Sequence, residues 1–237
     1  MLKAVSIDML KDKTFLAIIP ARGGSKGIPH KNIYPIRGIP LISYTLQESK
    51  KSKYLDRIIV STDDDSIADV TRSESVGVVM RPPELARDDS KTIDAILHVI
   101  ASIDDTYDYL VLLQPTSPLR KLSHIDEAIE LFLDSGCVPL ASVSRVQNHP
   151  ILIRSLNDEG KLVNLLNQIS TVRRQDMPDY YYVNGAIFIH SIADLSEDTS
   201  LNDNRLGYIM PPEYGLDVDE PFDIKRLEMM LDYLGRK

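Results

Sequence analysis

The chain contains one cysteine, Cys137, among its 237 residues. An internal disulfide and a zinc site built from several cysteines are therefore excluded. The chain also lacks an uninterrupted apolar run of about 18 residues, the length that a membrane-spanning helix needs. Residues 1–14 mix charged and apolar side chains and have no apolar stretch typical of a signal peptide. We therefore expect a cytoplasmic protein that binds no membrane, with residues 1–14 as an N-terminal extension.

Positive charge is also scarce, because 27 Lys and Arg stand against 35 Asp and Glu, which gives a net charge of −8. This balance argues against a nucleic-acid-binding protein or one that binds anionic membranes. The apolar content of 43% is ordinary for a globular protein. A chain of this length buries roughly 70–75% of its unfolded surface, so it has a full hydrophobic core.

Strand-like and helix-like segments alternate along residues 15–144. Such a βαβα order predicts an α/β fold with a mainly parallel sheet and helices on both faces. The expected strands cover 15–20, 57–61, 76–80, 109–113 and 139–144. The expected helices cover 41–51, 92–103 and 123–133, and a further helix follows the polar segment 62–66 and ends at about residue 74. Later segments add a strand at 180–190, a short strand at 208–210 and a terminal helix at 221–234.

The alternation stops at about residue 145. Two strand-like runs, 151–156 and 161–166, flank the turn signal Asn157–Gly160. We interpret residues 145–180 as a flap inserted into a main domain that spans 15–237. Because so short a segment cannot build its own core, we expect a second subunit to cover it in a homodimer.

The strand at 15–20 ends in a loop rich in glycine and positive charge, Ala21-Arg22-Gly23-Gly24-Ser25-Lys26-Gly27, which continues through Lys31. Glycines let the backbone approach an anion closely and direct N–H groups at it. Arg22, Lys26 and Lys31 add positive charge, and the loop contains no acidic residue. This basic loop matches neither the P-loop nor the dinucleotide fingerprint. It predicts a phosphate site, with a basic surface turn as the alternative.

Polar residues follow other strands of the expected sheet, and ligands of open α/β sheets bind at the carboxyl ends of the strands. Gln114 follows the strand at 109–113, and its amide can bond a sugar or a base, or else satisfy nearby backbone groups. Arg81 follows the strand at 76–80 and faces either a ligand or the nearby acidic residues Glu84 and Asp88. The acidic run 63–65 better fits the start of a helix.

Asp217 and Asp219 are separated by one apolar residue, so both carboxylates point to the same side of an extended chain. Such a pair suits Mg²⁺, which takes one or two carboxylates and completes its shell with water and phosphate oxygens. The alternative is a solvated acidic loop before the terminal helix.

Two further pairs are notable. Arg173 and Arg174 can grip a carboxylate or phosphate in a two-pronged manner, or else form a hydrated flap surface. Asn184 and Gly185 interrupt an apolar strand, which indicates either close approach of a ligand or a bulge.

Taken together and in this order, these segments resemble the acylneuraminate cytidylyltransferases, also called CMP-sialic acid synthetases. The resemblance extends from about residue 16 to 234. It rests on the motifs IPARGGSKGIPHKNI (19–33), IIVSTDD (58–64), RPPELARDDS (81–90), LLQPTSPLR (112–120), RRQDMP (173–178), NGAIFI (184–189) and LDVDEPFD (216–223).

The resemblance implies a Rossmann-like nucleotide-diphospho-sugar transferase fold with a dimerisation flap. It also implies that CTP and a nine-carbon 2-keto sugar acid react, with Mg²⁺ or Mn²⁺, to give a CMP-sugar and pyrophosphate. Four residues are expected to act in catalysis: Arg22, Lys31, Gln114 and Asp217. The nucleotide contacts are expected from Arg22, Gly23, Gly24, Ser25, Lys26, Lys31, Asn32, Arg81 and Thr92. Sugar contacts are expected from Gln114, Arg174 and Asn184, and metal ligation from Asp217 and Asp219.

The sugar itself stays open between N-acetylneuraminate and N,N'-diacetyllegionaminate. The SKG triplet, whose third residue is small, resembles the corresponding triplet of both kinds of enzyme. Some neuraminate enzymes carry a lysine shortly after the His-Pro pair, and here Ile151–Arg154 stands in its place. The alternatives are a pseudaminate enzyme, another nucleotidyltransferase of this fold acting on a sugar phosphate, and a catalytically silent protein that binds nucleotide sugars.

Overall fold

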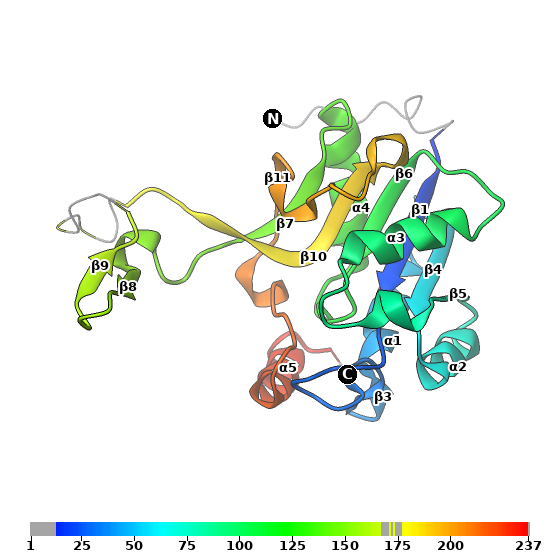
Figure 1. Cartoon of the computed structure of the whole chain (residues 1–237), viewed down its shortest axis with the longest axis horizontal. Helices are drawn as coiled ribbons and strands as arrows, with labels where there is room; N and C mark the ends of the chain where they lie inside the picture. Colours follow the sequence, from blue (N-terminus) through cyan, green and yellow to red (C-terminus); the bar gives the residue numbers. More distant parts are fainter. Residues whose placement is uncertain (1–12, 167–170, 172, 174–176, 237) are drawn as a thin grey trace.

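A seven-stranded sheet forms the centre of the molecule, in the strand order β11-β7-β10-β6-β1-β4-β5 (Figure 1). The computed structural model describes residues 13–166, 171, 173 and 177–236. The strands are β1 (Phe15–Pro20), β4 (Arg57–Thr62), β5 (Gly77–Met80), β6 (Tyr109–Leu113), β7 (Leu140–Arg145), β10 (Tyr181–Ser191) and β11 (Leu206–Ile209).

The sheet is parallel apart from one strand. β1 pairs in parallel with β4 and β6, β4 with β5, and β7 with β11, whereas β10 is antiparallel to both of its neighbours. Parallel neighbours need long crossover connections, which helices provide here. The helices are α1 (Leu41–Ser49), α2 (Asp65–Ser73), α3 (Thr92–Ala101), α4 (Leu122–Asp134) and α5 (Pro221–Tyr233). The expected α/β fold class is confirmed.

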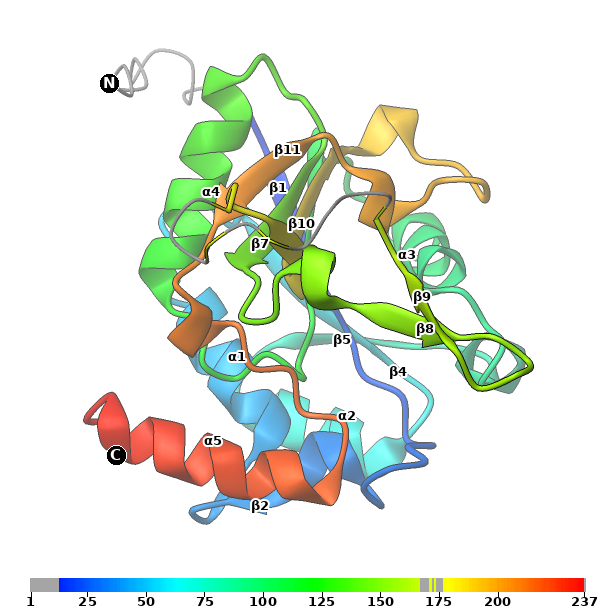
Figure 2. The same ribbon diagram turned by 90° about the vertical axis from the view of Figure 1, so that its left-hand side faces the viewer.

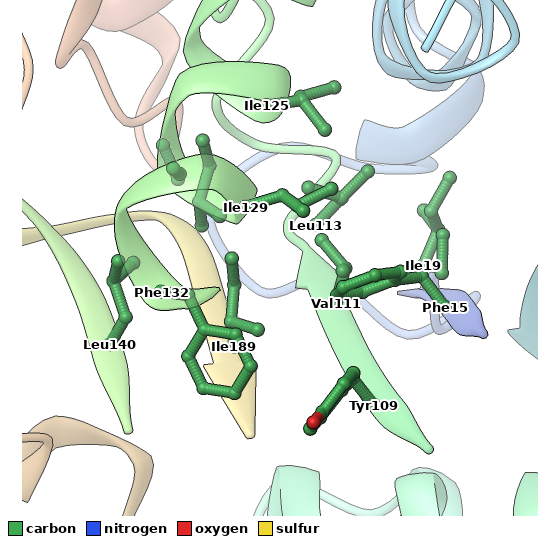
Figure 3. Packing of buried hydrophobic residues seen from close by; sticks show 14 of the residues in the cluster. Phe15, Ile19, Tyr109, Val111, Leu113, Ile125, Ile129, Phe132, Leu140 and Ile189 are labelled. Carbon is green, nitrogen blue, oxygen red and sulfur yellow. The ribbon is translucent and has the colours of Figure 1, made fainter. Parts of the chain in front are cut away.

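Helices cover both faces of the sheet, so its central strands are apolar throughout. One core cluster joins α1, α2 and α4 to one face, and a second joins α3 to the other. Figure 3 shows the first cluster, in which Phe132 of α4 lies near Tyr109 of β6. Their rings meet edge to face with centroids 5.1 Å apart. In the described part of the chain, none of these helices is long and apolar enough to cross a membrane.

A third, smaller cluster places the C-terminal helix beside the first loop of the chain. Leu227 and Leu231 of α5 pack with Ile36 and Leu41, next to the two-residue strands β2 (Pro35–Ile36) and β3 (Ile39–Pro40). The segment before α5 is fixed to the end of β6, because the Val218 N–H donates to the Thr116 carbonyl at 2.8 Å. These contacts bring residues 217–219 close to the basic loop.

The chain leaves the sheet after β7 and returns in β10. Between them, β8 (Arg154–Leu156) and β9 (Leu162–Asn164) form a separate antiparallel hairpin. Figure 1 shows this hairpin away from the sheet, beyond the twisted ends of β7 and β10, and Figure 2 shows it from that side, in front of the sheet. The strand β8 is shorter than the range 151–156 expected from the sequence. The reason is that Pro150–Leu152 forms a 3-10 turn in which the His149 ring accepts the Ile151 N–H at 3.2 Å.

The packing of α4 on the sheet generates a stability prediction. Phe132 is fully buried, so Phe132→Ala leaves a cavity and lowers the free energy of unfolding by about 3–5 kcal/mol. The control is Phe222→Ala on α5, whose side chain is 67% exposed and whose loss costs no more than about 0.5 kcal/mol. Urea denaturation measures both variants. Equal destabilisation by the two substitutions would contradict this packing.

Candidate nucleotide-binding site

A cleft of about 410 Å³ lies at the carboxyl ends of the parallel strands. This is the edge at which open α/β sheets bind ligands. Eight of the residues predicted for the site line the cleft together: Arg22, Ser25, Lys26, Lys31, Asn32, Arg81, Thr92 and Gln114. They come from three segments, which follow β1, β5 and β6, are far apart in the sequence and are brought side by side by the sheet order.

The basic loop is held at its start by an acidic residue that follows β4. The Gly23 N–H donates to Asp63 Oδ1 at 3.0 Å, and Asn32 Nδ2 donates to the Arg22 carbonyl at 2.9 Å. The next residue, Asp64, caps α2 by accepting the N–H groups of Ser66 and Ile67. Asp64 thus has the role expected of the acidic run, whereas Asp63 fixes the basic loop.

Two glycines let the loop lie close to its neighbours. A Cβ on Gly27 would come within 2.2 Å of the Asp219 carbonyl oxygen, and one on Gly23 within 2.6 Å of the Asp64 carboxylate. Gly24 has no neighbour within 4 Å of a Cβ position. At Gly27 the backbone of the basic loop therefore lies directly against the segment at 217–219.

The cations of the loop meet carboxylates from other segments. Arg22 Nη1 lies 2.9 Å and Lys26 Nζ 2.8 Å from the two oxygens of Asp88, which belongs to the loop after β5. The Lys26 ammonium and the Arg22 guanidinium hold the pKa of Asp88 below its usual value. Because these are exposed pairs, they stabilise the fold little, and an anion with more charge can replace Asp88.

Lys31 connects the basic loop to the acidic pair. Its ammonium donates to Asp219 Oδ1 at 2.7 Å and to the Val218 carbonyl at 3.0 Å. Surrounding protein atoms desolvate the Asp217 carboxyl and raise its pKa, and the neighbouring Asp219 carboxylate adds to the rise, whereas Thr116 and Lys31 oppose it. The negative charge of Asp219 therefore disfavours the charged form of Asp217, and a cation bound to both would offset this effect.

Arg81 and Asn32 carry polar atoms without a partner in the described part of the chain. The guanidinium of Arg81 is buried and donates to the Ser61 carbonyl at 3.0 Å and to the Leu85 carbonyl at 3.3 Å, while its Nε has no partner. Burial lowers the pKa of Arg81, and the charge of Asp63 opposes this. Asn32 Oδ1 is likewise buried and unpaired. Both residues line the cleft.

Gln114 and Asn184 lie differently from each other. Gln114 lines the cleft at the end of β6, whereas Asn184 is buried. Asn184 Nδ2 donates to Ser144 Oγ at 2.9 Å, and its Oδ1 accepts the Ser142 hydroxyl and the Ala186 N–H. Both ends of this amide are occupied inside the protein, so Asn184 joins β10 to β7. A contact between Asn184 and a sugar stays a prediction, and Arg174 lies outside the described residues.

Two acidic residues of the site were not predicted. The sequence pattern places Asp63 at the start of a helix, whereas in the structure it binds the Gly23 N–H. The sequence offers Asp88 as a surface partner of Arg81, whereas in the structure it pairs with Arg22 and Lys26. The motif IIVSTDD carried a signal for Asp63, because its two consecutive carboxylates follow a strand and one of them suffices to cap α2.

The close approach at Gly27 generates a prediction. Gly27→Ala forces the basic loop away from the Asp219 backbone and lowers the free energy of unfolding by about 1–3 kcal/mol, as overpacking does. Gly24→Ala is the matched control in the same loop and changes this free energy by no more than about 0.5 kcal/mol. Chemical denaturation compares the two. A Gly27→Ala protein as stable as the control would show that the loop and the segment at 217–219 do not lie in close contact at Gly27.

Comparison with known proteins identifies the family of this chain. The family profile described as cytidylyltransferase matches residues 16–208. The chain is 37% identical to an N-acylneuraminate cytidylyltransferase of Streptococcus agalactiae serotype V over 94% of its own length and 55% of that protein. It is 33% identical to a CMP-N,N'-diacetyllegionaminic acid synthase of Legionella pneumophila over 92% of its length and 96% of that protein.

A solved structure shares the fold. It is a CMP:2-keto-3-deoxy-manno-octonic acid synthetase complexed with CTP, with a TM-score of 0.71, 16% identity and coverage of 94% of this chain and 100% of that one. The chain spans about half the length of the N-acylneuraminate cytidylyltransferases that it matches. Since the family profile covers most of the chain and the relatives exceed 30% identity, this chain belongs to the cytidylyltransferase family.

Proposed function

We propose that this protein transfers the CMP group of CTP to a nine-carbon 2-keto sugar acid and releases pyrophosphate. One observation carries the proposal: three cations of the basic loop and Gln114 line a single cleft at the carboxyl edge of the sheet, and one of these cations, Lys31, binds Asp219 of the acidic pair. The names of the sequence relatives support CTP and a sugar acid of the neuraminate or legionaminate type.

The basic loop would hold the triphosphate. Arg22 and Lys26 would exchange the Asp88 carboxylate for phosphate oxygens, and Lys31 would reach the phosphates from its position beside Asp219. The N–H groups of Gly23, Gly24 and Ser25 belong to the same loop, although the Gly23 N–H donates to Asp63 here. Charge neutralisation by fixed cations is the main way in which proteins promote phosphoryl and nucleotidyl transfer.

The nucleoside would lie along the opposite wall of the cleft. Asn32, Arg81 and Thr92 line it, and the unpaired atoms Asn32 Oδ1 and Arg81 Nε offer an acceptor and a donor. A base held by both kinds of group can be distinguished from bases with another hydrogen-bond pattern. These residues therefore support selection of CTP among the nucleoside triphosphates.

The reaction would be an in-line displacement at the α-phosphorus. The anomeric hydroxyl of the sugar acid attacks, the bond to the leaving pyrophosphate breaks, and the CMP group is transferred. Holding the two substrates in line supplies much of the rate. Gln114, at the end of β6, would orient the sugar, and Arg22 and Lys31 would stabilise charge on the phosphates.

The acidic pair fits a divalent metal ion. Asp217 and Asp219 offer hard oxygen donors, and a bound cation would offset the effect of the Asp219 charge on the Asp217 carboxyl. Within the described ranges, no group of three or more His, Cys, Asp or Glu side chains comes together that could hold a metal on its own. Two carboxylates and substrate phosphates are an ordinary set for Mg²⁺, for which Mn²⁺ can substitute. When bound there, the metal would neutralise charge on the triphosphate.

The sugar would contact Gln114, with Arg174 gripping its carboxylate and Asn184 shaping the strand behind it. The relatives include both a neuraminate and a legionaminate enzyme, which favours these two sugar acids over pseudaminate or a sugar phosphate. Since CTP and sugar acids are cytoplasmic metabolites, we place the reaction in the cytoplasm.

The hairpin supports the proposal of a homodimer. Large apolar side chains on it and beside it are exposed: Leu152 (60%), Leu156 (69%), Leu162 (71%) and Leu165 (60%). A two-stranded hairpin is only marginally stable alone, and an exposed apolar patch of this kind marks an interface. A second copy related by two-fold symmetry would cover it.

Pyrophosphate release tests the proposed reaction directly. CTP, GTP and UTP are each combined with N-acetylneuraminate, N,N'-diacetyllegionaminate, a pseudaminate and a sugar phosphate in the presence of Mg²⁺. We expect release with CTP and one of the first two sugar acids. Turnover of GTP or UTP with a sugar phosphate would establish the alternative nucleotidyltransferase, and no turnover with any pair would contradict catalysis.

The acidic pair generates a prediction about metal-dependent turnover. Replacing Asp217 and Asp219 together by Asn keeps their shape and removes two charges, so kcat falls at least about 100-fold, as it does on loss of an electrostatic stabiliser. Asp69→Asn, which removes an exposed carboxylate on α2, leaves kcat unchanged. Steady-state kinetics over a range of Mg²⁺ concentrations measures the effect. A double variant with normal turnover at low Mg²⁺ would place the metal elsewhere.

The hairpin generates a prediction about the assembly of two subunits. Leu156→Asp together with Leu162→Asp puts charge on a cross-strand pair and converts the dimer to a monomer in light scattering. Met229→Asp on α5 is the matched control, because Met229 is 71% exposed, as Leu162 is. Dissociation by the control and not by the hairpin variant would move the interface to α5.

A further inference from the structure

Arg120 is a charged residue inside the protein, outside the cleft and without a role in the reaction proposed above. It is 1% exposed, at the end of the loop that joins β6 to α4. Among the described residues no carboxylate forms an ion pair with it. Burial lowers its pKa to about 9, and the charge of Glu48 opposes this shift. A buried cation without an ion-pair partner is costly, so its hydrogen bonds need an explanation.

The guanidinium spans three acceptors from three elements. Nη1 donates to the Ala186 carbonyl at 2.6 Å and to the Gln114 carbonyl at 3.2 Å, and Nη2 donates to Thr45 Oγ1 at 2.8 Å. Arg120 therefore ties the end of β6 to β10 and fastens both to α1. The planar fork of Arg suits several acceptors at once, whereas the ammonium of Lys is a single point.

The point on β10 that Arg120 holds is irregular. The pairing of β10 with β7 shifts register between Val183 and Phe188, and Gly185 has a φ of +76°. A Cβ on Gly185 would lie 2.9 Å from Gln114 Oε1. The Gln114 side chain therefore lies directly against the backbone of Gly185. The carbonyl of the following residue, Ala186, accepts the hydrogen bond from Arg120.

We infer that Arg120 is a positioning residue, which holds the Gln114 backbone and the Gly185–Ala186 backbone together so that the Gln114 amide is fixed at the wall of the cleft. The inference rests on the proposed function, in which Gln114 orients the sugar. Arg120 touches no substrate. It acts through Gln114 alone, so it affects the acceptor sugar and leaves the nucleotide site, built by the basic loop and Arg81, unaffected.

The test compares Arg120→Lys with Thr45→Val. Arg120→Lys keeps the charge and loses the fork, and Thr45→Val removes the contact with α1 but leaves both carbonyl contacts in place. Arg120→Lys is expected to raise the KM for the sugar acid about tenfold, since a misplaced orienting group costs up to about 100-fold. The Kd for CTP, measured by calorimetry, stays within twofold, and Thr45→Val changes neither constant.

A second readout does not depend on turnover. The side-chain amide resonances of Gln114, assigned by their loss in Gln114→Glu, are expected to shift or broaden in Arg120→Lys and not in Thr45→Val. If the Gln114 resonances shift in Arg120→Lys but the wild-type protein shows no turnover, the positioning role of Arg120 is supported and the proposed reaction is contradicted. Unchanged resonances and an unchanged sugar KM in Arg120→Lys, or equal losses of CTP and sugar binding, would show that Arg120 only supports the fold.

Discussion

The cleft depends on carboxylates that hold a positively charged loop in place. Asp63 binds the backbone of the loop at Gly23, Asp88 binds Arg22 and Lys26, and Asp219 binds Lys31. Each comes from a different segment at the carboxyl edge of the sheet. In an acidic protein these pairs keep the three cations gathered at one place. The pairs with Asp88 are exposed, so a more highly charged anion would replace that carboxylate at little cost.

The parallel sheet explains why these segments meet. β1, β4, β5 and β6 all end at the same edge, so the loops that follow them surround one space. The antiparallel β10 and the segment before α5 complete it, through Gly185 beside Gln114 and through Val218 bonded to Thr116. The hairpin lies away from this space within one chain (Figure 1).

Most of the fold could be predicted because its strands are short apolar runs between turn signals. The strand at 15–20 has the predicted bounds, and so has the strand at 109–113. The expected strand at 151–156 was wrong in its first half, because Pro150 begins a turn that the His149 ring caps. The grouping of basic residues in one loop was visible in the sequence. The acidic partners were not, because Arg22 and Asp88 are 66 residues apart and meet only through the sheet order.

The central claim is that the basic loop binds the triphosphate of CTP by exchanging carboxylates for phosphates. A crystal structure of the protein with CTP and Mg²⁺ tests it most directly. The account predicts phosphate oxygens in contact with Arg22, Lys26 and Lys31, with Asp88 separated from the first two. A triphosphate bound elsewhere, with Asp88 still paired to Arg22 and Lys26, would contradict it.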